Sequence, residues 1–485
     1  MDRFTGQRRV AVIGGGVSGL AAAHRLRRLA PGLDVRLLES GPRLGGVIRT
    51  HRESGFLIEG AADNFITNPP HAVDLCHDLG LTDELIRTNP NGHGAMVVSR
   101  GRLEPIPPGF VVMAPSRVWP LLSTRVLSPL GKLRSACELL APRKRGGDDE
   151  SLESFVTRRF GREMFERLVQ PLVGGIYTAD PARLSVAATM PRFLEMERKH
   201  GSLIRAMMAE RRQRGQAREE HGGARYSQFM TLRGGMSRLI DALGASLPAD
   251  AVCHNAPVHA LDHDGDGWRL SYGDGGRLDA DAVVVACPAP QAAAIVRRVD
   301  PTITRLLSQI EYASCAVVSL AFGRDQIRRP INAFGFVAPR IEGRRILSCS
   351  FSSEKYAGRA PEGAVLMRVF IGGALQPGLL DSPDSGLVEL ACQELAALLR
   401  IRGGPILSHV TRQNHAMPQY HLGHLDRVAQ INQRLLARPT LALAGSALNG
   451  VGAPGCIASG QEAARRVVAA MESSPIGRAA PGGVV

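Results

Sequence analysis

The sequence lacks the marks of several protein classes. Its eight cysteines lie far apart and form no Cys-x-x-Cys pair, so neither a zinc site nor a disulfide framework is indicated. No apolar run reaches the ~18 residues of a membrane-spanning helix, since the uncharged stretch 282–296 carries Pro288 and Pro290. Residues 1–9 lack the apolar core of a signal peptide. We therefore expect a protein that does not span a membrane and that works in a reducing cytoplasm.

Acidic residues are in the minority. The chain has 59 Lys and Arg against 45 Asp and Glu, a formal net charge of +14, which favours an anionic partner. No basic helix interleaved with aromatic residues and no zinc-finger spacing occurs, so we expect no nucleic-acid partner. A membrane surface, a carboxylated substrate and a generally basic solvated surface all remain compatible with the charge.

Length and composition indicate an ordinary globular protein. With 485 residues and 44% hydrophobic content the chain can bury a large core, and two to three domains are expected. The one low-complexity stretch is 473–485, which we expect to be disordered.

The first recognisable motif is a glycine turn between a strand and a helix. Residues 10–13 are a short apolar run typical of a buried strand, and Gly14, Gly16 and Gly19 follow at the spacing of a dinucleotide-binding turn. Gly14 permits the turn, Gly16 admits a pyrophosphate, and Gly19 allows close packing of the helix, whose first N–H groups face the anion. A second apolar run at 35–38 ends at Glu39, which is placed to accept hydrogen bonds from a ribose hydroxyl.

A second glycine turn follows at 43–46. An arginine, Arg43, stands beside the paired glycines Gly45 and Gly46, where its guanidinium can reach a pyrophosphate lying on the first turn. This combination resembles the FAD-binding fingerprint of the amine oxidase and protoporphyrinogen oxidase superfamily.

Further along, the pattern alternates between helical and strand-rich regions. Residues 47–59 are typical of a hairpin, 71–79 of an amphipathic helix, and 196–223 of a solvated helix leading into a linker. Prolines break 101–147 into short pieces that mix apolar and basic residues, which fits either a surface that sinks into an anionic bilayer or an ordinary helical cap. Strands are expected at 256–261, 268–272, 282–286, 316–322, 365–371 and 440–445, and a final helix at 461–471.

Five motifs together resemble those of the protoporphyrinogen oxidase family and extend from residue 9 to about residue 471. They are the turn at 14–19, Glu39 with 43–46, Thr231-Leu-Arg-Gly-Gly-Met, Met417-Pro-Gln-Tyr-His-Leu-Gly-His424, and Gly450-Val-Gly with Cys456-Ile-Ala-Ser-Gly460. The segment at 417–424 is the most specific, since other flavin amine oxidases lack it. A covalent flavin cysteine of the monoamine oxidase kind has no counterpart here.

The resemblance implies an FAD enzyme that oxidises a porphyrinogen to the porphyrin in three two-electron steps, with dioxygen as acceptor, in haem biosynthesis. The cofactor carries such chemistry and the protein positions and shields it. In agreement, no nucleophile, metal cluster or acid–base pair stands out in the sequence, and no metal site is predicted. The resemblance further implies a monomer or homodimer in the cytoplasm, with peripheral contact to the inner face of the membrane left open.

The resemblance also implies where the ligands lie. Gly175 falls where the family sets a backbone carbonyl near the substrate. FAD contacts are implied for Gly14, Gly15, Gly16, Val17, Ser18, Gly19, Glu39, Ser40, Arg43, Gly46, Val47, Ala61, Ala62, Asp63, Asn64, Val258, Gly445, Gly450, Val451 and Gly452. Helix-start N–H groups near the last of these are placed to stabilise negative charge on reduced flavin.

Two departures from the family pattern bear on specificity. Protoporphyrinogen-selective members often place a propionate-binding arginine where this chain has Gly94 and Ala95. Either Arg100 and Arg102 substitute for it, or the pocket resembles that of the coproporphyrinogen III oxidising bacterial branch. Ala61 and Ala62 stand where the family usually has Gly-Pro.

The predicted fold is α/β (α+β): an amine-oxidase-type FAD domain with an inserted mixed-sheet substrate domain and a helical domain, which either faces a membrane or forms an ordinary cap. The predicted division assigns 1–95, 226–297 and 426–472 to the FAD domain, 96–225 to the helical domain, 298–425 to the substrate sheet and 473–485 to the tail. Two other classes remain as alternatives: another flavin enzyme such as an amine oxidase or carotenoid desaturase, and a non-catalytic FAD-binding scaffold protein.

Overall fold

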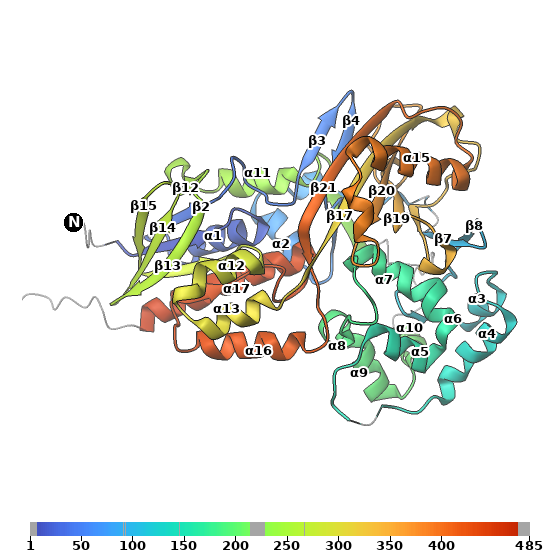
Figure 1. Ribbon diagram of the computed structural model, residues 1–485, viewed down its shortest axis with the longest axis horizontal. Coiled ribbons are helices and arrows are strands. Elements are labelled where there is room, and N and C mark those ends of the chain that lie inside the picture. Colours follow the sequence, from blue (N-terminus) through green and yellow to red (C-terminus); the bar gives the residue numbers. More distant parts are fainter. Residues whose placement is uncertain are drawn as a thin grey trace, which may run out of the picture.

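The computed structural model describes residues 7–473 except 91, 93, 145, 214–227 and 266. The predicted tail beyond Ser473, and residues 214–223 of the predicted solvated helix and linker, therefore lie outside the described residues. The fold is mixed α/β, as predicted, and has three regions in Figure 1: a nucleotide-type region, a region around a large, mostly antiparallel sheet, and a group of helices beside that sheet.

The first region is built on a five-stranded parallel sheet whose strands come from three distant parts of the chain. Its order is β12 (Val252–Cys253), β2 (Asp34–Leu38), β1 (Arg9–Ile13), β16 (Ala282–Val285) and β22 (Leu441–Leu443). Val10 and Val12 pack into one hydrophobic core, and Ala11 and Ile13 into another. Both faces are therefore buried, which explains why these strands read as continuous apolar runs.

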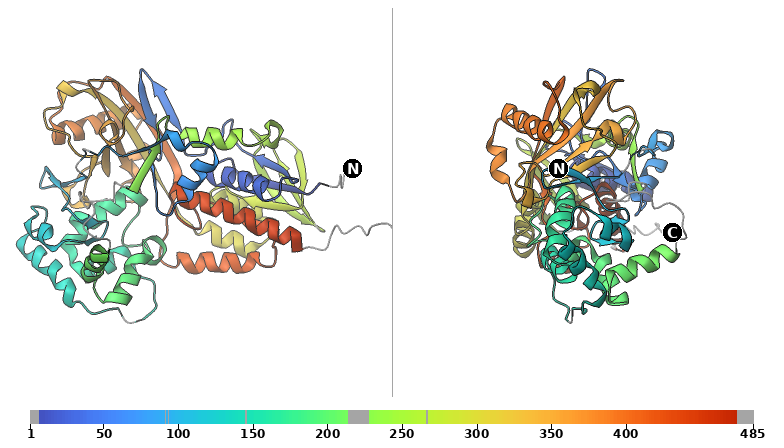
Figure 2. Two further views of the ribbon diagram at one scale, coloured as in Figure 1. Left: turned by 180° about the vertical axis from the view of Figure 1, so that it is seen from behind. Right: turned by 90° about the vertical axis from the view of Figure 1, so that its right-hand side faces the viewer.

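Helices cover one face of this sheet and a three-stranded sheet with further helices covers the other (Figures 1 and 2). The first layer consists of α1 (Val17–Leu29), α17 (Ala453–Ser473), α2 (His71–Asp78) and α11 (Ser237–Ala245). The second consists of β13 (Val258–Asp264), β14 (Gly267–Tyr272), β15 (Gly276–Ala280), α12 (Ala289–Ile295), α13 (Pro301–Ser308) and α16 (His424–Leu435). Helix α17 begins at Ala453, eight residues before the predicted start at residue 461, so residues 453–460 are helical.

The second region is a seven-stranded sheet that contains the predicted long antiparallel strands. Its order is β21 (Leu407–Pro418), β17 (Tyr312–Gly323), β20 (Ala364–Gly372), β19 (Ser348–Phe351), β18 (Gly335–Val337), β7 (Met96–Ser99) and β8 (Arg102–Pro105). Helix α15 (Asp384–Leu399) packs on its outer face. The predicted hairpin forms β3 (Thr50–Glu53) and β4 (Phe56–Glu59), which pack beside β21 through Phe56 and Ile58.

The third region contains α3 (Val118–Ser123), α4 (Pro129–Ala136), α5 (Leu152–Phe160), α7 (Gln170–Tyr177), α9 (Pro191–His200) and α10 (Leu203–Gln213). The prediction of a solvated helix from 196 onward is wrong for α10, because Leu203, Ile204 and Met207 are buried in the core of this region. Burying such side chains contributes ~1.5–3 kcal/mol each. The helix gains this energy while charges on its opposite side, such as that of Arg205, stay in solvent. Among the described residues no helix is both long and apolar enough to cross a membrane.

Candidate functional site

The first glycine turn joins β1 to α1 and leaves open space on one side. A Cβ added to Gly19 would lie 1.9 Å from the carbonyl oxygen of Gly14, whose φ is +104°, so both positions require glycine. A Cβ added to Gly16 would meet nothing within 4 Å. Gly16 also caps α1 without a side-chain hydrogen bond, and the first turn of α1 carries no acidic residue. The turn therefore leaves the start of α1 without a side-chain cap or an acidic residue, an arrangement that suits an anion.

The second glycine turn lies directly beside the first. The Gly45 N–H donates to the Gly15 carbonyl over 2.8 Å, and Gly16 and Gly45 form a parallel bridge. A Cβ on Gly46 would come within 3.4 Å of the Gly16 Cα atom. The two turns thus form one continuous backbone surface, on which a side chain from either turn would intrude.

Glu39 ends β2 at the edge of this surface. Its carboxylate accepts hydrogen bonds from the N–H groups of Gly15 over 2.7 Å and of Gly41 over 2.8 Å, and from the Ser40 hydroxyl over 3.2 Å. The Ala256 N–H donates to the Glu39 carbonyl, so the chain just before Val258 borders the same edge. Glu39, Ser40 and the approach to Val258 therefore lie together at one edge of the two glycine turns.

Arg43 has a different orientation from the one predicted. Its guanidinium donates to the carbonyl oxygens of Leu44, Gly46 and Ile48 and so closes its own turn. Burial, with a smaller contribution from Arg49, lowers the pKa of Arg43. In this arrangement Arg43 shapes the second glycine turn, and Val47, 48% exposed, borders the open side.

The third glycine segment, residues 445–460, packs against the first glycine turn. The Gly445 N–H donates to the Ser459 hydroxyl over 3.0 Å, and a Cβ on Gly460 would lie 2.0 Å from the Ser18 carbonyl oxygen. Helices α1 and α17 therefore pack with their backbones in close approach near their N-terminal ends. Gly450, Val451 and Gly452, which immediately precede α17, lie in this loop.

The segment 417–424 fastens that loop to its surroundings. The Tyr420 hydroxyl donates to the Ser446 carbonyl, and the Tyr420 ring stacks on His424 at 4.0 Å. A ring nitrogen of His424 lies 3.2 Å from the Leu448 carbonyl. The Gln419 amide donates to the Tyr177 carbonyl at the end of α7. This motif therefore holds the third glycine segment against α7 and β21, which gives it a structural role.

A short loop, residues 60–64, leaves β4 and crosses the inner face of the seven-stranded sheet. The Gly60 N–H donates to the Arg49 carbonyl, and the Gly60 carbonyl accepts from the Gln413 amide of β21 over 3.0 Å. The Ala61 carbonyl accepts a hydrogen bond from the guanidinium of Arg368 on β20. The loop predicted to pass along a flavin is thus held by β3 and by two strands of the sheet.

Asp63 of this loop joins two buried cations. Its carboxylate lies 3.3 Å from the Lys355 ammonium and 3.3 Å from the Arg368 guanidinium, and it accepts from the Asn64 amide. Burial alone would raise the pKa of Asp63, but Lys355 and Arg368 outweigh it and hold the pKa below its usual range. Burial lowers the pKa of Lys355. The Nε atom of Arg368 is buried and has no hydrogen-bond partner among the described residues.

A third buried arginine extends this cluster. Arg359, 1% exposed, donates to the carbonyl oxygens of Leu232 and Arg233. Burial raises the pKa of Glu59, the second carboxylate near these cations. Three buried cations thus face two carboxylates, which leaves the inner face of the sheet electropositive next to loop 60–64. Sequence reasoning missed these cations, although a lone arginine inside the apolar strand 365–371 was a usable signal.

Gly175 lies on α7, where the helix meets the seven-stranded sheet. A Cβ on Gly175 would contact Ser348 of β19 and Val337 of β18 at 3.8 Å. The inner face of the sheet and α7 therefore enclose the position predicted to face the substrate. Tyr177, two residues on, is half-buried, and the loss of solvent around its hydroxyl raises its pKa to about 12.

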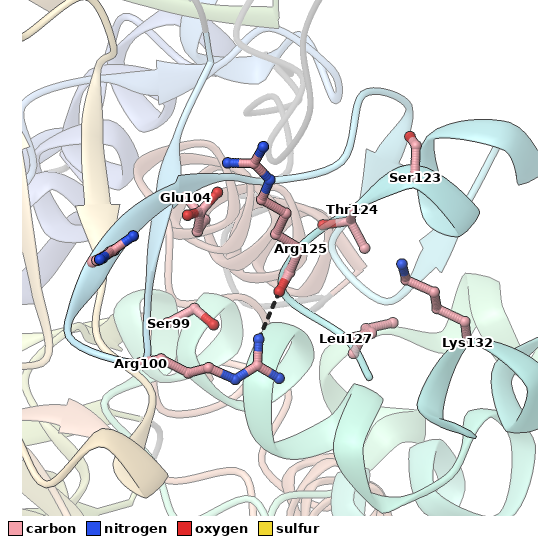
Figure 3. Close-up of a pocket in the computed structure, with 9 residues that line it drawn as sticks. Ser99, Arg100, Glu104, Ser123, Thr124, Arg125, Leu127 and Lys132 are labelled. Atoms are coloured by element: carbon pink, nitrogen blue, oxygen red, sulfur yellow. Dashed lines mark hydrogen bonds between the residues drawn. The ribbon is translucent and has the colours of Figure 1, made fainter. Parts of the chain in front are cut away.

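Arg100 lies elsewhere, in a hollow between the β7–β8 turn and α3–α4 (Figure 3). The hollow has a volume of about 610 Å³, and Gly175 and loop 60–64 do not line it. The guanidinium of Arg100 donates to the Arg125 carbonyl over 2.9 Å, and the backbone N–H of Arg100 to Glu342 over 2.8 Å. Arg100 and Gly175, the two residues predicted to bind substrate, therefore lie in separate places. The hollow is lined by Ser99, Arg100, Arg102, Glu104, Ser123, Thr124, Arg125, Leu127 and Lys132.

Comparison with known proteins covers nearly the whole chain. Residues 17–468 match the model of the flavin containing amine oxidoreductases. The chain is 37% identical to the coproporphyrinogen III oxidase of Propionibacterium freudenreichii over 96% of its own length and 92% of that protein. It is 34% identical to the coproporphyrinogen III oxidase of Bacillus subtilis, with 94% and 97% covered. The crystal structure of a provisionally named protoporphyrinogen oxidase from Exiguobacterium sp. 255-15 superimposes with a TM-score of 0.84 at 30% identity, over 96% and 99% of the two chains.

Proposed function

The chain belongs to the family of flavin-containing amine oxidoreductases, and on that premise we propose that it is an FAD-dependent porphyrinogen oxidase of haem biosynthesis that acts on coproporphyrinogen III. The observation that carries the proposal is the end-to-end match to relatives named coproporphyrinogen III oxidase. The absence of an arginine at 94–95 favours this substrate over protoporphyrinogen IX.

The residues present fit FAD. The open side of Gly16, the adjoining backbone of Gly46 and the uncapped start of α1 make a cradle that an added Cβ would fill. Glu39 stands at its edge, with a carboxylate able to accept from ribose hydroxyls. We propose that the residues predicted from the sequence to contact FAD do so, with Arg43 acting by shaping the turn. When bound, FAD supplies the two-electron oxidant for each of the three steps.

The chain's own part is to bind, orient and shield the macrocycle. We propose that Gly175 faces the substrate across from β18 and β19, where α7 and the sheet exclude water. The surplus of buried cations near loop 60–64 favours negative charge on groups bound beside it. Arg100, with Arg102, Arg125 and Lys132, is proposed to attract the carboxylates of the substrate from its separate hollow.

The same part of the surface supports a peripheral membrane contact. Its large apolar side chains are well exposed: Trp119 is 77% exposed, Leu122 41%, Leu130 78%, Leu133 64% and Leu140 82%. The cations of the hollow lie beside them, and such a mixture suits the face of an anionic bilayer. We propose that α3 and α4 dock on the inner face of the membrane.

The remaining assignments are also proposals. Dioxygen is the proposed acceptor, so each porphyrinogen, which loses six hydrogen atoms, reduces three dioxygen molecules to hydrogen peroxide. The proposed assembly is a monomer or a homodimer. The proposed domain division is the one predicted from the sequence, with two changes. Residues 96–105 are moved to the substrate sheet because β7 and β8 pair within it. Residues 298–308 are moved to the FAD domain because α13 packs on the parallel sheet.

Side-by-side turnover of coproporphyrinogen III and protoporphyrinogen IX tests the proposal. We expect a higher kcat/KM with coproporphyrinogen III and a peroxide yield of three per porphyrin formed. A preference for protoporphyrinogen IX would overturn the substrate assignment, and turnover of an amine or a carotene instead of either porphyrinogen would overturn the function.

A further inference from the structure

Three side chains with metal-ligating atoms meet where the β3–β4 hairpin packs on β21. The rings of His51 and His409 stack with their centroids 4.6 Å apart and their planes at 15°. A ring nitrogen of His51 lies 3.2 Å from a carboxylate oxygen of Glu53. One ligating atom from each of the three residues lies within 4.8 Å of the other two.

The fold holds all three side chains toward the same seam. On the hairpin, His51 is opposite Ile58 and Glu53 is opposite Phe56, so the four side chains share one face. Phe56 and Ile58 pack with Leu407, two residues before His409 on β21. His51 and Glu53 therefore face His409 across a packed contact, which Figure 1 shows as the hairpin lying against β21.

We propose that His51, Glu53 and His409 bind a divalent transition-metal ion of the zinc type. Two imidazoles and a carboxylate are a common donor set for such an ion, with water completing a tetrahedron. Bonds of about 2.0–2.1 Å require ligating atoms about 3.4 Å apart. The ligating atoms must therefore close by about 1 Å. One of the two stacked rings must also turn, so that both imidazole lone pairs point at the ion. The three side chains are partly or largely exposed, which permits both movements.

An ion at this seam would clamp the hairpin to the sheet. The hairpin leads directly into loop 60–64, and Gly60 is held by Arg49 at one end of β3 and by Gln413 of β21. Metal binding would thus stabilise the two elements that support this loop. The site does not depend on the proposed function, since no reacting group is involved.

Calorimetric titration of the tag-free, FAD-loaded protein with zinc sulfate near neutral pH tests the proposal. We expect one site per chain with a dissociation constant in the micromolar range, and binding at least about tenfold weaker in each of His51→Ala and His409→Ala. His259→Ala, which removes an exposed histidine of β13, is the matched control and should bind as the wild type does.

The spectra of bound cobalt and copper give a second measurement of the site, because they report the metal's own ligands and not the stability of the fold. Cobalt(II) should give tetrahedral absorption bands, and copper(II) should show nitrogen hyperfine coupling in electron paramagnetic resonance, both lost in the two histidine variants. Glu53→Gln, which keeps the size of the side chain, should weaken zinc binding while retaining flavin. Absence of binding heat, or equal affinity in His51→Ala, His409→Ala and the wild type, would overturn the proposal.

Discussion

Asp63 and Arg368, distant in sequence, form an ion pair at 3.3 Å beneath the loop that leaves β4. Lys355 approaches the same carboxylate from α14 (Ser352–Lys355). Arg368 also holds the backbone of Ala61, so one buried arginine fixes both the charge and the course of loop 60–64. The interface between the nucleotide-type region and the seven-stranded sheet thus depends on a small buried electrostatic cluster.

Asp63→Asn should therefore destabilise the protein strongly. Removing one partner from a buried ion pair leaves uncompensated charge and typically costs about 3–5 kcal/mol. We expect a lower melting temperature and easier loss of flavin, measured by thermal unfolding and by flavin release on dilution. Asp384→Asn is the control, since that carboxylate is 61% exposed in its pair with Arg412 and should cost about 1 kcal/mol or less. Equal losses in both variants would contradict the role of the cluster.

The stabilising effect of Asp63 should fade in acid. Its pKa is depressed in the folded protein, so its contribution is fully present above the ordinary carboxylate value of about 4 and is lost as the pH falls through the lower folded value. The difference in melting temperature between wild type and Asp63→Asn should be constant from neutral pH to about pH 5 and should shrink below about pH 4. A difference that widens with acidification would show that the carboxylate is not held ionised by Lys355 and Arg368.

Gly16→Ala and Gly19→Ala should separate cofactor binding from folding. A methyl group at Gly16 meets open space in the protein, and φ there is −69°, so the flavin-free protein should keep its stability. The same methyl would occupy the pyrophosphate cradle, and FAD should bind at least about tenfold more weakly, a loss of ~1.4 kcal/mol. Equilibrium FAD titration and thermal unfolding of the flavin-free protein measure the two effects.

Gly19→Ala should instead damage the fold itself, because its methyl would lie 1.9 Å from the Gly14 carbonyl oxygen. We expect a lower melting temperature even without FAD. If Gly16→Ala bound FAD as tightly as the wild type, the cofactor would not lie on this turn.

Leu130→Glu and Leu133→Glu should weaken membrane association. Both side chains lie on α4, 78% and 64% exposed, beside Lys132 of the basic hollow. Co-sedimentation with anionic vesicles should fall in both variants, and the wild type should release from vesicles as salt screens the cations. Leu436→Glu, 65% exposed at the end of α16, is the matched control and should pellet like the wild type. No pelleting of the wild type with anionic vesicles would remove the proposed contact.

The sequence was most informative where backbone geometry demands one residue type. The turn at 14–19 and the parallel strands that flank it could be predicted because their glycines and apolar runs are local signals. Burial of α10 could not be predicted from its dense charge, because tertiary packing decided which face is covered.

The buried ion-pair cluster and the histidine cluster could not be predicted from the sequence, for a different reason. Asp63 and Arg368, like His51 and His409, lie on segments that meet only through the pairing of the hairpin and loop with the seven-stranded sheet. A pairing of this kind depends on long-range register, which local patterns do not encode. Arg100 is the opposite case. It directly follows β7 of the seven-stranded sheet, but it lines a hollow that does not include Gly175.

The most direct test is to mix the purified yellow protein with coproporphyrinogen III in the absence of oxygen and to follow the visible absorbance of its flavin. We expect the flavin to bleach within single turnovers, porphyrin to form in step, and air to restore the colour. Protein that comes out colourless even after incubation with FAD, or flavin that stays oxidised with coproporphyrinogen III and with protoporphyrinogen IX, would contradict the proposed function.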